Sequence, residues 1–315
     1  MSSQQRADRG GNGRADAARK RKLQDKEIII MDGGIGTEIL RRGVNWASHQ
    51  IQDDPGLVRS IHADYIATGA DVITTNTFQL SRRSFRNHFN DRQHMEAIGA
   101  LALEEQADEL IRDAVGLARQ AREASGREEV SIAGSMTTLE WCFRPDLTPE
   151  TEAMQEEYRQ QVQLFRDAGA DLILFETFNR VAEARIALQA AAELKIPAWM
   201  GFVSDAEGRL LSGETMRDVA AGLKGLTVEV VLINCCPVDH TTRGMEELAR
   251  HWPGPTGAFA HVGKFYPPVW HFTDECPPER YLKEARRWKE LGAAVIGGCC
   301  GTTPPYIDLL NSDLR

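Results

Sequence analysis

The sequence lacks any long apolar run. No stretch approaches the roughly 18 to 20 apolar residues that a membrane-spanning helix needs, and the chain does not begin with the apolar segment of a secretory signal. A composition of 42 % hydrophobic and 26 % charged residues is typical of a globular protein. We therefore expect a soluble protein, and a cytoplasmic location is the favoured interpretation.

Aromatic and β-branched residues are absent from residues 1–24, which hold seven Lys or Arg and two Asp. This composition predicts a disordered basic tail, with an organelle transit peptide as the alternative. Because the tail contributes +5 to a net charge of −9, the body at 25–315 carries about −14. Such a body would repel nucleic acids and anionic membranes, so neither is an expected partner.

A disulfide framework is also missing. The six cysteines are unevenly spaced and include two adjacent pairs, at positions 142, 235, 236, 276, 299 and 300. Adjacent cysteines rarely bridge each other without strain, and a chain of 315 residues can bury a core without cross-links. Reduced thiols in this setting indicate metal or redox chemistry.

No GxGxxG motif follows the first predicted strand, which argues against a dinucleotide-binding open sheet. Instead, eight short β-rich runs alternate with stretches of helical periodicity, a pattern typical of a parallel sheet. We predict one (β/α)8 TIM-barrel domain over 25–315, with a doubly wound sheet as the structural alternative. The predicted strands are Ile28–Met31, Val72–Phe78, Val130–Met136, Leu172–Phe178, Ala198–Val203, Val228–Asn234, Gly257–His261 and Ala294–Gly297.

Reactive residue types gather at the carboxyl ends of these strands, where a barrel carries its active site. A single cysteine there is usually a small buried hydrophobe, but two clusters on different strands favour a ligand set. One thiolate from the sixth strand and two from the eighth would give zinc three of its four tetrahedral positions and leave the fourth open. The strand ends concerned are Asp32-Gly33-Gly34, Asn76-Thr77, Glu176-Thr177, Asn234-Cys235-Cys236 and Gly298-Cys299-Cys300.

A zinc ion held by three thiolates suits a thiol substrate, which it would keep deprotonated and still nucleophilic. Activation of water fits less well, because sulfur ligands make zinc a weaker Lewis acid. Glu176 could pair with an ammonium group and the amides of the Gly33–Gly34 turn with a carboxylate, which together indicate an amino-acid thiol. The alternatives are a structural ion pair for Glu176 and a simple strand-to-helix turn for the two glycines.

Five stretches of the chain closely resemble the homocysteine S-methyltransferase family. They are MDGGIGTEILRRG (31–43), GADVITTNTFQLS (69–81), LILFETF (172–178), INC (233–235) and GGCCGTTP (297–304). The resemblance implies a zinc-binding barrel in which a methyl group passes to the thiolate of homocysteine.

By this resemblance, the zinc ligands are Cys235, Cys299 and Cys300. Asp32, Gly33 and Glu176 would hold the amino-acid end of homocysteine. Asn76 and Trp46 are further candidate substrate-binding residues, and Cys236 is an extra cysteine that we expect to serve packing, with a competing ligand role as the alternative.

The resemblance also narrows the methyl donor, because family members use S-methylmethionine, betaine or, in larger proteins, methyltetrahydrofolate through cobalamin. This chain has no room for added folate and cobalamin domains and ends soon after the eighth strand, so we expect S-methylmethionine, with betaine or another sulfonium as the alternative. The loops over 133–143 and 258–268 depart from the family pattern and predict a remodelled donor pocket. Candidate aromatics for a cationic donor are Trp46, Phe78, Trp141 and Phe143, although each could serve packing instead.

A non-catalytic interpretation of the cysteines is a zinc or redox sensor. It predicts metal binding without turnover, and it gives no reason for Asp32 and Glu176 to stand at neighbouring strand ends.

Overall fold

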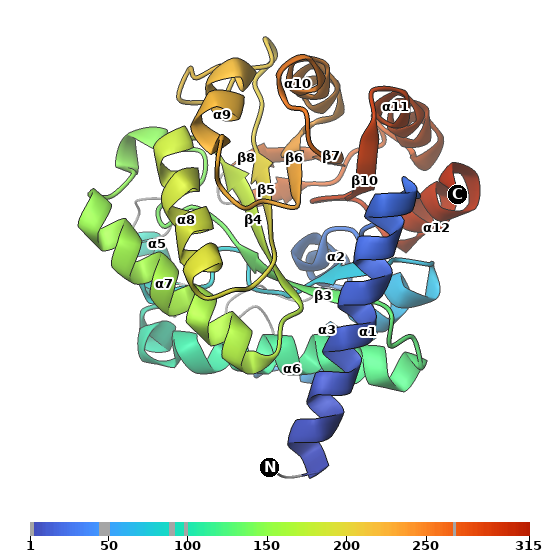
Figure 1. Cartoon of the computed structure of the whole chain (residues 1–315). Helices are drawn as coiled ribbons and strands as arrows, with labels where there is room; N and C mark the ends of the chain where they lie inside the picture. The colour runs from blue at the N-terminus through green and yellow to red at the C-terminus, as the bar shows by residue number, and fades with distance from the viewer. Residues whose placement is uncertain (1–2, 44–50, 88–91, 98–99, 267–268) are drawn as a thin grey trace.

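The computed structural model describes residues 3–43, 51–87, 92–97, 100–266 and 269–315, and these form a (β/α)8 barrel (Figure 1). Eight parallel strands pair in the order β1-β10-β7-β6-β5-β4-β3-β2, and a bridge between Met31 and Val72 closes the ring. The predicted fold is therefore confirmed. The strands are β1 (Ile29–Ile30), β2 (Val72–Thr74), β3 (Ser131–Met136), β4 (Leu172–Phe178), β5 (Ala198–Phe202), β6 (Val230–Pro237), β7 (Thr256–His261) and β10 (Ala293–Gly298).

All eight predicted strands are present, and β4 has the predicted bounds. The largest difference is β2, which ends at Thr74, so that Asn76 and Thr77 lie in the loop beyond it. A second difference is a short antiparallel hairpin, β8 (Lys264–Tyr266) and β9 (Val269–His271), which follows β7 and was not predicted.

Helices surround the barrel and cover its outer face (Figure 1). In the part of the chain that the structure describes, no helix is both long enough and apolar enough to cross a bilayer. The α-helices are α1 (Ser3–Asp25), α2 (Ile35–Arg41), α3 (Pro55–Ala67), α4 (Arg82–Asn87), α5 (Arg92–Ala97), α6 (Ala107–Ser125), α7 (Thr151–Ala168), α8 (Val181–Glu193), α9 (Met216–Leu223), α10 (Val238–His251), α11 (Pro278–Glu290) and α12 (Pro304–Leu314), with 3-10 helices at Ala100–Gln106 and Pro145–Leu147.

Side chains alternate between two apolar layers along each strand. In β6, Val230 and Leu232 belong to the barrel interior, whereas Val231 and Ile233 pack in the outer layer between strands and helices. The interior cluster is bounded by Leu23 of α1 and by Cys300, which both pack against it. The barrel is thus a filled core with two different ends, which we call the α1 end and the cysteine end.

For residues 3–24 the predicted disorder is wrong, because they lie in α1, a helix that contacts β1 and β3 (Figure 1). Ala15 and Arg19 are buried and Leu23 is half-buried, a spacing of four residues that places them on one helix face. Composition missed this face because a buried arginine counts as solvated charge. The separation of 1–24 from a domain at 25–315 stays a prediction.

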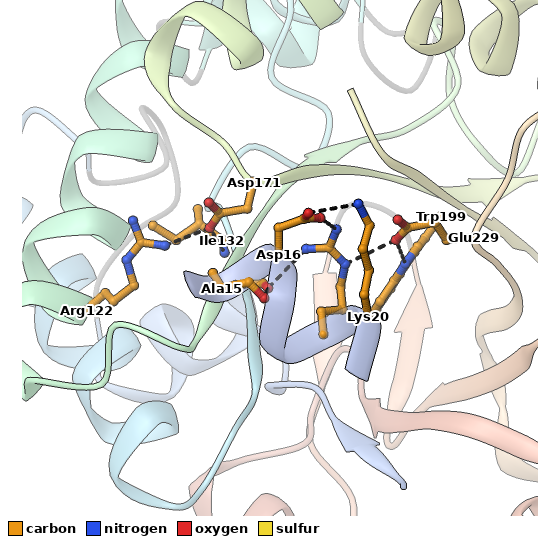
Figure 2. Close-up of polar contacts among 10 residues, drawn as sticks. Ala15, Asp16, Lys20, Arg122, Ile132, Asp171, Trp199 and Glu229 are labelled. Carbon is orange, nitrogen blue, oxygen red and sulfur yellow. Dashed lines mark hydrogen bonds and ion pairs between the residues drawn. The ribbon is translucent and has the colours of Figure 1, made fainter. Parts of the chain in front are cut away.

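Ion pairs attach α1 to the amino ends of the strands. The Arg19 guanidinium, 3 % exposed, donates to Asp16 (2.6 Å), to Glu229 before β6 (3.1 Å) and to Ser131 of β3 (3.2 Å). Figure 2 shows Trp199 and Lys20 in the same group, where the Trp199 indole donates to Glu229 (3.2 Å) and the Lys20 ammonium to Asp16 (2.8 Å).

A second buried ion pair lies beside this group (Figure 2). Arg122 of α6 donates to Asp171 at 2.7 Å, and the same carboxylate accepts the Ile132 amide at 2.7 Å. Each of these buried charges therefore has an opposite partner, although the second carboxylate oxygen of Asp171 has no hydrogen-bond partner among the described residues.

Candidate metal and substrate site

Three thiols meet at the cysteine end of the barrel. The sulfur atoms of Cys235, Cys299 and Cys300 all lie within 4.8 Å of one another, and they are the one such group of potential metal ligands found among the described residues. Cys235 and Cys299 are buried and Cys300 is half-buried. All six cysteines are free thiols in this structure.

The backbone brings adjacent cysteines to one point because β10 ends at Gly298 and the chain turns. Gly301 has φ +82°, and a Cβ atom there would lie 1.9 Å from the Val262 carbonyl oxygen, so only glycine fits this turn. The Gly301 amide donates to the Thr37 hydroxyl at 2.8 Å, which attaches the turn to α2. Because the strand ends and the backbone turns here, the side chains of Cys299 and Cys300 can point toward the same position.

Cys235 reaches the cluster by a different device. It has φ +50°, a left-handed conformation that is uncommon for a residue with a side chain, and the register of β6 shifts between Asn234 and Pro237. This bulge lets the Cys235 side chain join the interior cluster. Cys236, by contrast, belongs to the outer layer, where its sulfur lies 3.2 Å from the Thr241 hydroxyl.

The thiols polarise one another. Hydrogen bonds from Cys235 and Cys299 hold the pKa of Cys300 well below its usual range. The pKa of Cys235 is raised by its hydrogen bonds with Cys299 and, second, with Cys300, and also by burial. The cluster therefore already favours one thiolate, the form in which cysteine binds metals.

Two buried carboxyl groups lie at this end of the barrel, and Glu176 is the one that interacts with the thiols. Burial raises the pKa of Glu176 to about 7, opposed by a hydrogen bond from the Ser135 hydroxyl and reinforced by the Cys300 charge. Burial also raises the pKa of Asp32, with Glu176 adding to the effect. Neither carboxyl group has an ion-pair partner among the described residues. A cationic ligand would supply the missing charge.

Asp32 also has a structural role, because its carboxylate accepts the Thr74 amide at 2.7 Å and the Thr74 hydroxyl at 3.1 Å. These bonds attach the end of β1 to β2. The Gly34 amide donates to the Thr302 carbonyl at 3.3 Å, so the glycine turn cannot offer both of its amides to a carboxylate.

The remaining candidates differ in position. Asn76 is buried in the loop after β2. Trp46 lies outside the described residues. Trp141 and Phe143 pair edge to face in the loop after β3, with ring centroids 6.3 Å apart.

Sequence reasoning missed His261, the last residue of β7. Burial lowers the pKa of its imidazole, which faces the Cys300 charge and hydrogen-bonds to the Cys235 backbone. The Trp270 indole of β9 packs against it edge to face, with ring centroids 5.5 Å apart. The position of His261 at a strand end was the available signal.

Comparisons with known proteins agree with this geometry. Residues 29–314 match the family model described as homocysteine S-methyltransferase. The chain is similar to the homocysteine S-methyltransferase of Escherichia coli (strain K12), with 32 % identity over 92 % of this chain and 96 % of that protein. It is also similar to the selenocysteine Se-methyltransferase of Brassica oleracea var. italica, with 27 % identity over 96 % and 94 %.

Solved structures give the same result. The metallated form of the homocysteine methyltransferase MmuM from Escherichia coli superposes with a TM-score of 0.73 at 29 % identity, covering 90 % of this chain and 96 % of that one. Its oxidized form gives a TM-score of 0.74 at 29 % identity over 93 % and 98 %. The family model itself starts at residue 29, after α1.

Proposed function

Because the chain belongs to the homocysteine S-methyltransferase family, we propose that it transfers a methyl group from S-methylmethionine to homocysteine, with zinc held by Cys235, Cys299 and Cys300. The observation that carries this proposal is the thiol cluster at the carboxyl end of the barrel, within 4.8 Å from sulfur to sulfur. Its free thiols also fit the predicted cytoplasmic location, where disulfides are rare.

The donor set suits zinc. Tetrahedral coordination with bonds of about 2.3 Å places sulfur ligands roughly 3.8 Å apart, which the cluster can reach with small side-chain movements. Three protein ligands leave a fourth position for a substrate, as catalytic zinc sites do. When bound there, zinc would keep the homocysteine thiol deprotonated while its thiolate ligands leave that sulfur nucleophilic.

The protein residues around the cluster fit the rest of homocysteine. The carboxylate of Glu176 in β4 would bind the ammonium group, and Asp32, which follows β1, is proposed to help hold the same amino-acid end. The Gly33 amide is proposed to bind the substrate carboxylate. Asn76 and Trp46 complete the set of substrate-binding residues that we propose.

The proposed transfer is an in-line displacement. A bond forms between the homocysteine sulfur and the methyl carbon as the bond from that carbon to the donor sulfonium breaks. The bonding electron pair returns to the donor sulfur, which leaves as a neutral thioether. Alignment of sulfur, carbon and leaving sulfur supplies the rate enhancement, and no proton moves on the methyl carbon.

The donor would approach past aromatic side chains. Trp141 and Phe143 lie in the loop after β3, within the stretch 133–143 that departs from the family pattern, and Trp270 lies in the hairpin after β7, just beyond the second such stretch at 258–268. Aromatic faces stabilise a sulfonium or a quaternary ammonium group. Betaine is therefore the second donor to test.

The deciding experiment measures methionine after incubation of the zinc-loaded protein with homocysteine and, separately, S-methylmethionine, betaine, dimethylsulfoniopropionate or S-adenosylmethionine. We expect the highest turnover with S-methylmethionine. Methionine from betaine alone would reject the sulfonium assignment, and no methionine from any donor would reject the activity.

A further inference from the structure

Asn234 bridges two strands that are not neighbours. It is the interior residue of β6 directly before Cys235, and it is fully buried. Its side-chain oxygen accepts the backbone amide of Thr177 in β4 at 3.1 Å. The bond crosses over β5, which lies between the two strands.

Both ends of this bridge are backbone bulges next to proposed site residues. Thr177, with φ +59°, follows Glu176, and Cys235, with φ +50°, follows Asn234. The strand register shifts at each place. Left-handed residues with side chains persist only where their surroundings hold them. The hydrogen bond from Thr177 to Asn234 joins the two bulges directly.

Gly201 of β5 makes the crossing possible. A Cβ atom at position 201 would lie 2.5 Å from the side-chain oxygen of Asn234 and 3.3 Å from the Phe175 carbonyl oxygen. No other residue would leave this space for the amide. The sequence places glycine at the one point of β5 that the Asn234 side chain passes.

The amide nitrogen of Asn234 has no hydrogen-bond partner among the described residues, although it is buried. The bond to the Thr177 amide fixes the orientation of the side chain, because only the oxygen can accept. A buried donor without a partner is unfavourable, and such groups are few in native proteins, so each needs an explanation. Packing alone therefore does not explain asparagine at this position.

We propose that Asn234 is a positioning residue that fixes the separation between Glu176 and Cys235, and so matches the amino-acid end of the substrate to the metal-bound sulfur. This inference rests on the proposed function. Asn234 is proposed to touch neither the methyl group nor the leaving sulfur. It acts through the two bulges.

The first test compares Asn234→Ala with Leu232→Ala, a matched control two residues earlier on the same interior face of β6. Loss of the bridge should weaken metal binding about 10- to 100-fold, measured by competition with a chelator. It should also raise the homocysteine KM more than it lowers kcat. Leu232→Ala should lower the unfolding midpoint and leave both quantities as in wild type.

The second test disturbs the same contact from β5. Gly201→Ala should reproduce the weaker metal binding and the raised KM, because its methyl group displaces the Asn234 oxygen. The double variant with Asn234→Ala should be no worse than Asn234→Ala alone, since the clash disappears. Additive losses would show two independent defects and overturn the proposal.

Wild-type metal affinity and KM in Asn234→Ala would also overturn it, as would equal losses in Leu232→Ala. A wild-type protein that binds no metal and forms no methionine would reject the proposed function instead. The two failures are therefore distinguishable.

Discussion

The two ends of the barrel bound the same interior cluster with opposite chemistry. At the α1 end, the buried Arg19 has three polar partners, and the nearby Asp171 is paired with Arg122. At the cysteine end, Glu176 and Asp32 are buried without a cationic side chain in the described part of the chain, and three thiols crowd together. At the α1 end the buried arginines have carboxylate partners within the protein, whereas the two carboxyl groups at the cysteine end have hydrogen-bond donors but no cationic partner among the described residues. We therefore expect substitutions at the α1 end to change stability and substitutions at the cysteine end to change activity.

The largest effect is expected at the cysteine end. Cys299→Ser combined with Cys300→Ser should abolish methionine formation, because two of three proposed metal ligands are lost. The unfolding midpoint should stay that of the metal-free wild type. Activity retained with full metal content would show that the cysteines are not the ligands.

The next largest effect is expected at the α1 end. Arg19→Met removes the cationic partner of Glu229, which keeps only the Trp199 indole, while Asp16 keeps Lys20. It should reduce the free energy of unfolding by about 3 kcal/mol, the low end of the range for a broken buried pair. Urea unfolding measures this, and kcat/KM of the folded protein should be unchanged. Arg14→Met is the control, because the Arg14 pair with Glu128 is exposed and should contribute less than about 1 kcal/mol. A loss of activity in Arg19→Met without a loss of stability would contradict the assignment of stability to the α1 end and of activity to the cysteine end.

His62, which lies at neither end of the barrel, predicts a loss of stability in acid that does not depend on the site. His62 of α3 is fully buried, both ring nitrogens lack a partner among the described residues, and burial lowers its pKa from 6.5 to about 4. The unfolded chain binds the proton more tightly, so this contribution to stability is complete above pH 6.5 and is lost as the pH falls toward 4.

The free energy of unfolding should therefore fall by about 3 kcal/mol more in wild type than in His62→Leu between pH 7 and pH 4. Urea unfolding at a series of pH values gives both curves. Parallel curves would mean that His62 is not the group responsible.

The smallest effect is expected for a single carboxyl group in the site. Glu176→Gln keeps the side-chain shape and the contact with Ser135 but removes the negative charge. We expect the homocysteine KM to rise about tenfold with a smaller change in kcat, since a charged hydrogen bond to the ammonium group is lost. An unchanged KM would remove Glu176 from the substrate site.

The sequence predicted the cysteine end better than the α1 end, for a physical reason. Strand ends are marked by apolar runs that stop at polar residues, so Glu176 and the cysteines could be placed on one edge before any coordinates were known. Arg19 carries no such mark, because a buried and an exposed arginine look alike until the partner at Glu229, 210 residues away, is in place.

Within the site, the sequence did not predict the backbone conformation. The left-handed conformation of Cys235, the bulge at Thr177 and the passage over Gly201 depend on contacts between strands that no local pattern encodes. His261 was not predicted as a site residue because only its contacts place it there. These are with the neighbouring cysteines and with Trp270, which lies in an unpredicted hairpin. Residue types at strand ends were predictable, whereas their mutual contacts were not.

The most direct test of the central claim is X-ray absorption at the zinc edge of the purified full-length protein, before and after addition of homocysteine. We expect about one zinc per chain with three sulfur ligands at about 2.3 Å, rising to four sulfur ligands with homocysteine. A protein without zinc, or a zinc ion whose sulfur count does not change when homocysteine is added, would contradict it.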